Sequence, residues 1–334
     1  MIHLAIESSC DETSVAILED LRKIHCNLVS TQIPIHALYG GVVPEIASRK
    51  HLETINRLLD LAFEESGFGP QDIELVSVTR GPGLLGALLV GVSAAKALAY
   101  VRKIPIVGAN HMQGHICANY LANQDLEPPF ISLVVSGGHT YLVRVDDYSS
   151  YQVLGTTRDD AAGESFDKVS RVLGMGYPGG PKVQKLAEEG DPQAIDFPRA
   201  MMRKSDGYDF SFSGLKTAVI NYCHNQEQKG EEVNEADVAA SFQNAVIDVL
   251  VKKSAMVLDR TRMKNFCLSG GVAANRPLRE ALEAMCRERG VKFNYPGPEL
   301  CTDNAAMIGA AGYLQYKYKG GDDLGFSTDP GLGL

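Results

Sequence analysis

Short apolar runs with the period of β-strands alternate with longer segments of helical period along most of the chain. In the first third, two strands joined by a polar turn come first, and helices and strands then alternate. The predicted elements are strands at 4–6 and 14–18, a helix at 51–66, a strand at 75–79, a helix at 83–100, a strand at 104–108 and a helix from 111. A hairpin followed by alternating helices and strands predicts an α/β protein.

The pattern begins again at Pro128-Pro129. Two strands at 130–135 and 140–145 form a second hairpin, whose tip is Ser136-Gly137-Gly138-His139. The later predicted elements are helices at 158–173 and 235–260, a strand at 265–268, and helices at 277–290 and 305–313. Two halves that each open with a polar-tipped hairpin indicate an internal repeat of architecture without a short-period sequence repeat.

Two such halves are the parts of the actin, hexokinase and Hsp70 type of nucleotide-binding fold, abbreviated ASKHA. We therefore expect a two-lobed α/β fold with duplicated subdomains and a central cleft between the hairpin tips. The predicted lobes are residues 1–127 and 128–334, and the last helix is free to pack back on the first lobe. The tail after about residue 318 contains Gly320-Gly321-Asp322-Asp323 and is predicted to be mobile.

Composition narrows the class of protein. With 45% hydrophobic and 22% charged residues among 334, the chain has ample material for a globular core. No basic segment precedes an apolar one at the start, so a secretory signal is not expected. The apolar run Gly83 to Tyr100 carries Ser93 and Lys96, which favours a buried crossover helix over a membrane span. A cytoplasmic protein without a membrane anchor is the expectation.

Cysteine usage and net charge exclude two further classes. The seven cysteines are scattered and no Cys-x-x-Cys pair occurs, so neither a zinc knuckle nor a dithiol redox motif is present. Reduced thiols in a cytosolic protein are the simple inference. The net charge of −9 argues against broad nonspecific binding to nucleic acid. A nucleic-acid substrate held on a local basic patch, or with help from a partner, stays open.

The segment Asn110-His111-Met112-Gln113-Gly114-His115 carries the clearest candidate chemistry. Two histidines four residues apart on a helix lie on the same face, which is the spacing at which two imidazoles hold one metal ion. The helix begins directly after a strand, where open α/β sheets bind their ligands. The alternative is a pair of helix histidines that meet solvent or hydrogen-bond partners, so the metal interpretation needs a third ligand elsewhere.

Three other polar segments are candidates for ligand binding. Asp11 and Glu12, in the turn of the first hairpin, could hold a cation or a metal bound to phosphate, or lie in an ordinary exposed turn. The tip Ser136-Gly137-Gly138 lets main-chain N–H groups reach an anion, although glycine also simply forms hairpin turns. Ser269 to Asn275 joins a strand to a helix through Gly-Gly, a geometry typical of nucleotide sites. Asp303 precedes the helix at 305–313 and is either a functional carboxylate or a helix cap.

Five separated motifs together resemble one family closely. The chain resembles the bacterial transferases that make N6-threonylcarbamoyladenosine in tRNA, formerly named O-sialoglycoprotein endopeptidases, from residue 1 to about residue 318. The motifs, in order, are Glu7-Ser8-Ser9-Cys10-Asp11-Glu12-Thr13, Asn110-His111 with His115, Val135-Ser136-Gly137-Gly138, Ser269-Gly270-Gly271-Val272-Ala273-Ala274-Asn275 and Thr302-Asp303-Asn304.

The resemblance implies an activity and a set of site residues. The family transfers the threonylcarbamoyl group from threonylcarbamoyl-AMP to N6 of adenosine-37, directly 3′ of the anticodon, in tRNAs that read codons beginning with adenine, and releases AMP. His111, His115 and Asp303 would bind one divalent metal per subunit, Fe²⁺ or Zn²⁺. The residues implied to contact the adenylate are Val134, Val135, Ser136, Gly137, Gly138, Asp167, Gly180 and Asn275.

The resemblance also implies partners and carries one departure. The bacterial enzymes work with a paralogous ASKHA-fold subunit and a small ATPase. Archaeal and eukaryotic relatives have a tyrosine ligand where this chain has Val134, which cannot bind a metal, so a fourth protein ligand is in doubt. Asp11 is our choice of general base, because it lies at the tip of the first hairpin. The candidate tRNA contacts are Arg49, Lys50, Arg203, Lys204 and Lys216.

Three rival functions make different predictions. A zinc metalloprotease needs a glutamate directly after its first histidine, and this chain has Met112 there. An ASKHA-type kinase or ATPase binds nucleotide through Mg²⁺ and phosphate loops and does not need two helix histidines. A noncatalytic scaffold would transfer nothing. An assay with threonylcarbamoyl-AMP and unmodified tRNA separates all three from the transferase.

Overall fold

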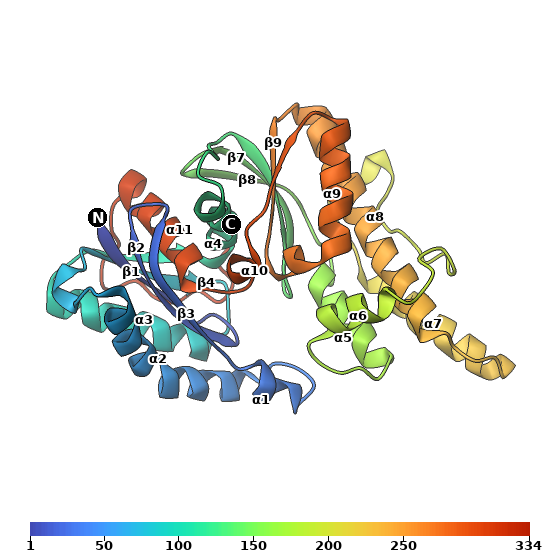
Figure 1. The fold of residues 1–334 in the computed structure, drawn as a ribbon, viewed down its shortest axis with the longest axis horizontal. Helices are drawn as coiled ribbons and strands as arrows, with labels where there is room; N and C mark the ends of the chain where they lie inside the picture. Colours follow the sequence, from blue (N-terminus) through green and yellow to red (C-terminus); the bar gives the residue numbers. More distant parts are fainter. The chain divides into compact units, whose positions relative to one another are not determined.

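The computed structural model describes residues 1–334, apart from the side chain of Lys204. The chain divides into two compact units, drawn in Figure 1. Unit 1 comprises Met1–Pro128, Asp146–Tyr151 and Tyr295–Leu334, and unit 2 comprises Pro129–Val145 and Gln152–Asn294. The segment from Tyr295 is therefore part of unit 1. The sequence predicts it in the second lobe, with its last helix free to pack on the first.

Unit 1 is built on a five-stranded sheet in the order β3-β2-β1-β4-β5. The opening hairpin is confirmed, because β1 pairs antiparallel with β2, and β2 pairs antiparallel with β3. On the other side of β1, the strands β4 and β5 run parallel. The bounds are β1 (Ile2–Glu7), β2 (Glu12–Glu19), β3 (Lys23–Thr31), β4 (Leu75–Gly81) and β5 (Ile106–Asn110).

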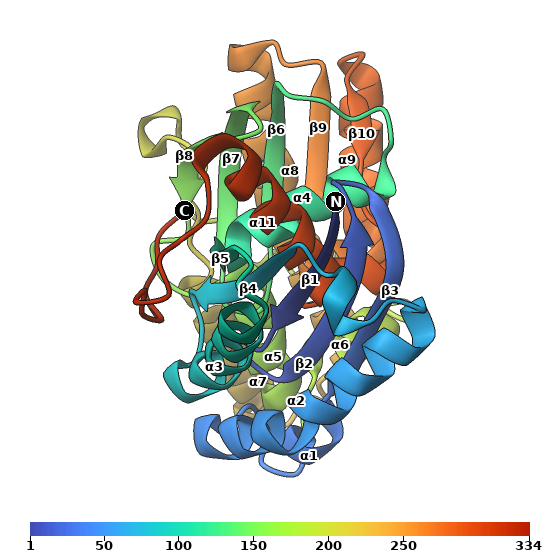
Figure 2. The same ribbon diagram turned by 90° about the vertical axis from the view of Figure 1, so that its left-hand side faces the viewer.

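The two faces of this sheet are covered by different helices. Successive residues of a strand point to opposite faces, and Leu4 and Ile6 belong to a core cluster with residues of α2 and α3, whereas Ala5 lies against α11. The arrangement can be followed in Figures 1 and 2. The helices are α1 (Ile33–Ala37), α2 (Pro44–Ser66), α3 (Leu85–Arg102), α4 (His111–Ala122), α10 (Pro298–Cys301) and α11 (Ala305–Lys319), with a 3-10 turn η1 (Pro70–Asp72).

Helix α11 packs directly against the sheet at two glycines, Gly309 and Gly312. A Cβ atom on Gly309 would lie 2.5 Å from Leu18 Cδ1, and one on Gly312 would lie 2.1 Å from Ser77 Oγ. Contacts this short do not occur between real side chains, so only glycine allows the observed approach. The position of α11 therefore fixes the residues that directly precede it, including Asp303.

The tail after α11 makes contacts along β4 and β5, although the sequence predicted a mobile segment. Asp322 forms an antiparallel bridge with Ile106 and accepts a hydrogen bond from the amide of Gly108 at 2.8 Å. Further on, the amide of Asp329 donates to the carbonyl of Arg80 at 2.9 Å. The tail thus covers the free edge of β5.

Helix α3 was expected to be a buried crossover helix. It does connect the parallel strands β4 and β5, but only 33% of the helix is buried within the chain. By length and composition it is also the one helix in the described part of the chain that could cross a membrane. A single helix of this kind is weak evidence for a membrane protein. Its outer face is exposed at Leu85 and Leu89.

Unit 2 repeats the topology of unit 1, which confirms the predicted duplication. Its sheet has the order β10-β9-β6-β7-β8, and β6 pairs antiparallel with β7 and parallel with β9, as β1 does with β2 and β4. The strands are β6 (Phe130–Val135), β7 (Thr140–Asp147), β8 (Ser150–Thr156), β9 (Asn265–Ser269) and β10 (Lys292–Asn294).

Hydrogen bonds of the preceding loop set the start of the first helix of unit 2. The predicted helix at 158–173 starts later, at Ala162, because Asp159 accepts hydrogen bonds from the amides of Phe212 and Ser213 and so belongs to a loop. The helices are α5 (Ala162–Val172), α6 (Gly179–Ala187), α7 (Ser213–Lys229), α8 (Glu235–Thr261) and α9 (Arg276–Glu288), with 3-10 turns η2 (Lys204–Asp206) and η3 (Gly271–Ala274).

Candidate functional site

The two histidines of α4 and the aspartate before α11 come together within unit 1. Helix α4 begins immediately after β5, where the side chain of Asn110 accepts hydrogen bonds from the amides of Met112 and Gln113 at 2.8 and 3.2 Å. This cap fixes the first turn, and hence His111. The cap of α11 is Asn304, which accepts from the amide of Met307 at 3.1 Å. Asp303 is therefore not needed as a cap.

The three side chains converge on a common point. Asp303 Oδ1 lies 3.4 Å from His111 Nε2 and 3.2 Å from His115 Nε2, and the ligand atoms of the three residues lie within 4.8 Å of one another. Both histidines are buried, whereas the side chain of Asp303 is 22% exposed. A ligand can therefore reach the point of convergence from the Asp303 side.

The donor set fits a divalent metal. In the described part of the chain, neither ring nitrogen of His115 has a hydrogen-bond partner, even though Asp303 lies close by. A buried imidazole without a partner is costly unless another group completes its surroundings. Two imidazoles and one carboxylate are a common metal-binding set that leaves coordination positions open for a substrate. The geometry thus supports His111, His115 and Asp303 as metal-binding residues.

A buried carboxylate holds the far side of the His111 ring. Glu7 Oε2 lies 3.0 Å from His111 Nδ1 and accepts a hydrogen bond from Thr79 Oγ1 at 2.6 Å. The amide of Ser9 donates to the other oxygen of Glu7, and Ser9 Oγ lies 3.2 Å from His111 Nδ1. With Nδ1 held in this way, Nε2 of His111 faces Asp303 and the candidate metal position.

The electrostatics of this pair follow from its burial. Burial favours the neutral form of Glu7, but the adjacent His111 ring outweighs it and holds the pKa of Glu7 below its ordinary value. Burial also disfavours a charged His111, yet the negative charges of Asp303 and Glu7 raise the pKa of His111 well above its ordinary value. Sequence reasoning missed Glu7, although a glutamate directly after the apolar run Leu4-Ala5-Ile6 is itself a signal of a paired charge.

The turn between β1 and β2 carries a second pair of acidic side chains. Asp11 and Glu12 are 7% and 9% exposed, so the predicted alternative of an ordinary exposed turn is wrong. Thr31 Oγ1 donates to Glu12 Oε1 at 3.0 Å, and the side chains of Asp11 and Glu12 are hydrogen-bonded. Burial and the negative charges of Asp11 and Asp303 raise the pKa of Glu12 to about 10. Glu12 therefore carries its proton at neutral pH and can donate it in the hydrogen bond to Asp11.

The predicted adenylate contacts all lie in unit 2. The tip Ser136-Gly137-Gly138 joins β6 to β7, and the carbonyl of Ser136 accepts a hydrogen bond from the amide of Gly163, at the start of α5. A Cβ atom on Gly137 or Gly138 would meet no atom within 4 Å, so the space beside the tip is open. Val134 and Val135 are fully buried in the sheet, so neither residue exposes surface beside the tip.

Two further loops of unit 2 are attached to this tip or to α5. Gly270 approaches Val135 so closely that a Cβ atom there would lie 2.4 Å from the Val135 carbonyl oxygen. Asp167 on α5 accepts a hydrogen bond from the amide of Gly179 at 2.7 Å, which places Gly180 next to it at the start of α6. Asn275 caps α9 and donates to Gln243 at 2.8 Å, so its side chain is already bonded at both ends.

The candidate tRNA contacts that the structure describes show no convergence comparable to that of His111, His115 and Asp303. Arg49 and Lys50 form exposed pairs with Glu45 and Glu53, both at 2.6 Å. The side chain of Lys204 lies outside the described part of the chain. Arg203 is exposed and Lys216 is partly exposed in unit 2.

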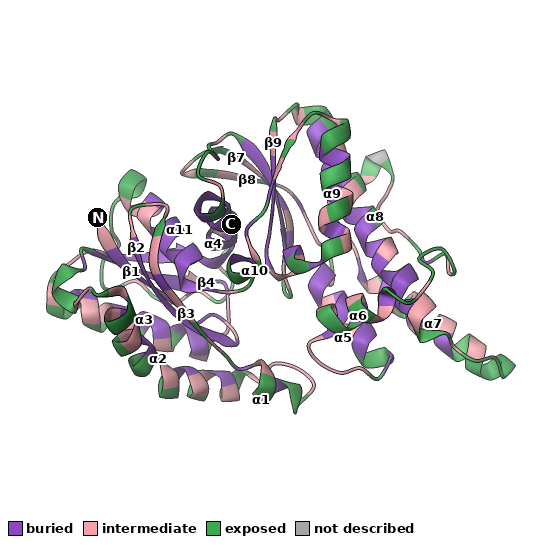
Figure 3. Cartoon of the chain, in the orientation of Figure 1, coloured by how far each residue is buried: buried purple, intermediate pink, exposed green. Residues whose placement is uncertain are grey.

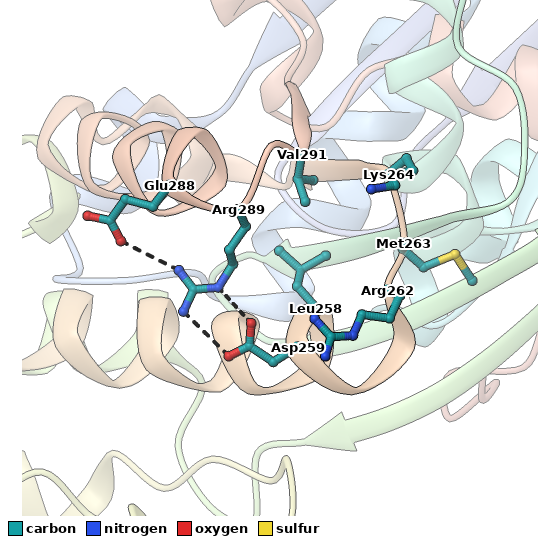
Figure 4. Close-up of a pocket in the computed structure, with 8 residues that line it drawn as sticks. All are labelled: Leu258, Asp259, Arg262, Met263, Lys264, Glu288, Arg289 and Val291. Carbon is teal, nitrogen blue, oxygen red and sulfur yellow. Dashed lines mark hydrogen bonds and ion pairs between the residues drawn. The ribbon is translucent and has the colours of Figure 1, made fainter.

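A hollow of about 290 Å³ lies at the end of α8, shown in Figure 4. Its basic and acidic side chains largely offset each other, since Arg289 is paired with Asp259 at 3.0 Å. None of the residues predicted from the sequence lines it. The lining residues are Leu258, Asp259, Arg262, Met263, Lys264, Glu288, Arg289 and Val291.

The duplicated sheets and the His-His-Asp group define a protein of the ASKHA fold with a candidate metal centre in its first unit. Solved structures of the same fold support this class. Full-length HypF covers 96% of this chain with a TM-score of 0.63 at 15% identity, and 56% of HypF is covered. An activator of 2-hydroxyisocaproyl-CoA dehydratase from Clostridium difficile covers 95% of this chain and is itself 96% covered, with a TM-score of 0.53 at 13% identity.

Sequence comparison is more specific. The family model of tRNA N6-adenosine threonylcarbamoyltransferase matches residues 23–310. The enzyme of that name from Clostridium perfringens is 51% identical over 333 residues, covering 100% of this chain and 98% of the relative. The one from Clostridioides difficile is 51% identical over 332 residues, covering 99% and 98%. The chain belongs to the tRNA N6-adenosine threonylcarbamoyltransferase family, and it is a transferase that modifies tRNA.

The contact between Glu7 and His111 predicts a measurable effect on metal binding. Glu7→Gln removes the negative charge behind the His111 ring, so we expect the affinity for Fe²⁺ or Zn²⁺ to fall about 10- to 100-fold. Titration of the metal-free protein with each ion measures it. Glu74→Gln, an exposed glutamate of unit 1, is the control. Unchanged affinity in Glu7→Gln would show that Glu7 does not orient His111.

Proposed function

We propose that the chain transfers the threonylcarbamoyl group from threonylcarbamoyl-AMP to N6 of adenosine-37 in tRNAs that read codons beginning with adenine, and that AMP is released. Membership of the family supports the reaction. The observation that carries the mechanism is the convergence of His111, His115 and Asp303 within 4.8 Å, with the Asp303 side chain 22% exposed.

The metal-binding residues would be His111, His115 and Asp303. A bound divalent metal would act as a Lewis acid on the carbamoyl carbonyl and would help to orient the adenylate. Nitrogen and carboxylate donors suit both Fe²⁺ and Zn²⁺, and we propose Fe²⁺ with Zn²⁺ as the alternative. The chain's own contribution is to hold the two Nε2 atoms in place, through Glu7 behind His111 and the cap at Asn110.

Asp11 is the proposed general base. The exocyclic amine of adenosine is a weak nucleophile and must lose a proton as its bond to the carbamoyl carbon forms. Glu12 is protonated at neutral pH because its pKa is raised to about 10, so it cannot accept that proton. Asp11 therefore takes the amine proton, and AMP departs with the electron pair of the carbonyl–phosphate bond.

Unit 2 supplies the proposed adenylate contacts. The open space beside Gly137 and Gly138 lets main-chain N–H groups at the Ser136–Gly138 tip approach a phosphate or a developing oxyanion. Asp167 and Gly180 lie together at the start of α6, and Asn275 lies at the start of α9. Holding the adenylate in one orientation supplies much of the acceleration, because the attacking amine then meets a fixed carbonyl.

Partner subunits are the second part of the proposal. A chain of net charge −9 attracts tRNA poorly, so a partner that adds positive surface would assist binding. We propose that a paralogous ASKHA-fold subunit and a small ATPase act with this chain in the cytoplasm. The outer side of α2 and α3 is the proposed contact for the paralogous subunit, because Leu52, Leu85 and Leu89 are 68%, 54% and 48% exposed there. Figure 3 shows exposed residues along both helices.

The transfer reaction and its metal requirement are tested together. The chain, with its partner subunits, is incubated with threonylcarbamoyl-AMP and unmodified tRNA, and modified adenosine is quantified. We expect removal of the metal by a chelator, or the variants His115→Ala and Asp303→Ala, to abolish transfer, and added Fe²⁺ or Zn²⁺ to restore the chelated wild type alone. Transfer at full rate by a metal-free preparation would contradict the proposed centre. Hydrolysis of ATP or of protein without transfer would favour a rival function.

Asp11→Asn tests the general base. The variant keeps the size of the side chain but cannot take a proton, so we expect kcat to fall about 10²- to 10⁴-fold. Metal content and adenylate affinity should stay at the wild-type level, because Asp11 is not among the metal-binding or adenylate-binding residues. Full transfer activity in Asp11→Asn would remove Asp11 from this position in the mechanism.

Leu89→Glu tests the proposed partner surface. A charge in the middle of an apolar contact is left unpaired and desolvated, so we expect at least about a tenfold loss of affinity for the paralogous subunit. Size-exclusion chromatography and calorimetric titration of the two subunits measure it. Val153→Glu, on an exposed apolar position of β8 in unit 2, is the matched control. Equal affinities of both variants and wild type would place the contact elsewhere.

A further inference from the structure

A third histidine of unit 1, His51 on α2, is buried beneath the turn that carries Asp11 and Glu12. Its side chain has no exposed surface, and both ring nitrogens are bonded. His51 Nδ1 lies 2.8 Å from Thr13 Oγ1, and Nε2 lies 2.9 Å from the carbonyl oxygen of Cys10. The ring thus connects the two residues that flank Asp11 and Glu12 on either side.

The chemistry of the partners defines the state of this ring. A carbonyl oxygen can only accept, so Nε2 of His51 carries the hydrogen and donates to Cys10. Nδ1 of the neutral ring is then an acceptor, and Thr13 Oγ1 donates to it. Burial lowers the pKa of His51, which agrees with a neutral ring. One fixed tautomer therefore holds both ends of the Cys10–Thr13 segment.

The rest of the turn is supported by a different helix. Ser8 Oγ donates to the carbonyl of Ala87 on α3 at 2.9 Å, and the amide of Leu84 donates to the carbonyl of Ser9 at 2.7 Å. Ser8 and Ser9 are therefore held by α3, and Glu7 is held by Thr79 of β4, whereas the segment with Asp11 and Glu12 is tied to α2 through His51. The amide of Gln32 also donates to the carbonyl of Asp11 at 2.9 Å, and Glu12 pairs with Thr31 of β3. Loss of the His51 ring would therefore loosen the turn around the carboxylate pair without unfolding it, and would leave the support of the metal-binding residues in place.

We propose that His51 is a positioning residue that fixes the Asp11–Glu12 carboxylate pair for the transfer step. The proposal deepens the proposed function and rests on the assignment of Asp11 as the base. His51 touches neither substrate nor metal. It acts through the two hydrogen bonds that set the conformation of the turn, and Thr13 is its second component.

Three substitutions separate this positioning from general stability. His51→Leu removes both hydrogen bonds, Thr13→Val removes only the one to Nδ1 at nearly the same volume, and Thr13→Ser retains the hydroxyl. The matched control is His3→Leu, since His3 is also fully buried and its Nε2 lies 2.8 Å from the carbonyl of Asp20, at the other end of β1. Each variant is measured for kcat, for KM of tRNA and adenylate, for Zn²⁺ affinity and for thermal unfolding.

We expect His51→Leu to lower kcat about 10²-fold, as a misplacement of catalytic groups by about 1 Å does. KM and Zn²⁺ affinity should stay within about twofold of wild type, because the supports on α3 are intact. Thr13→Val should lower kcat to a smaller extent, and Thr13→Ser should restore it. His3→Leu should unfold at a lower temperature with an unchanged kcat.

Two results would overturn the proposal. One is a Zn²⁺ affinity that falls together with kcat in His51→Leu, since the ring would then support the whole site and not the carboxylate pair. The other is full kcat in Thr13→Val and in folded His51→Leu. The variant Asp11→Asn tests separately whether Asp11 is the base. If Asp11→Asn is fully active while His51→Leu has a low kcat, Asp11 is not the base, and His51 still positions the turn through Glu12. If His51→Leu does not fold, Thr13→Val against Thr13→Ser decides.

Discussion

The close packing of α11 against the sheet of unit 1 is the constraint on which the candidate metal centre depends. Gly309 and Gly312 let the helix approach β1, β2 and β4 at distances that no larger residue permits. Helix α11 also packs against α4, where Gly114 faces Ile308. A shift of α11 away from the sheet would carry Asp303 away from the two imidazoles. The glycines, which bind nothing themselves, therefore determine the geometry of the centre.

Charge is arranged around this packing in two separate groups. Glu7 and Asp303 flank the His111 ring from opposite nitrogens, so the buried charges compensate one another and each would be costly alone. In the Asp11–Glu12 pair, two adjacent buried negative charges are avoided in a different way, because one carboxyl keeps its proton and hydrogen-bonds to the other. The turn between β1 and β2 joins both groups, and its two halves rest on different helices.

Sequence patterns predicted the parts of the structure that depend on local order. Both hairpins, the duplication and the spacing of His111 and His115 follow from periodicity and from residues close in sequence. The strand β3 was missed, although Ile24, Cys26 and Leu28 alternate with polar residues as in a half-exposed strand. Glu12 was a candidate from its place in the turn, but the contacts of Glu7 with His111 and of His51 with that turn could not be predicted, because they join partners distant in the chain. The resemblance, not the pattern, selected Asp303.

Unit 1 is discontinuous in sequence, and this has a consequence for biosynthesis. During translation, the strands β1 to β5 and helix α4 leave the ribosome first, unit 2 follows, and α11 emerges only at the end. The nascent first segment carries both histidines of the candidate centre but neither Asp303 nor the helix that covers one face of its sheet. Contacts of such long sequence separation form late. A newly made chain is therefore expected to complete the candidate metal centre only after synthesis is nearly finished, when unit 2 has already been made.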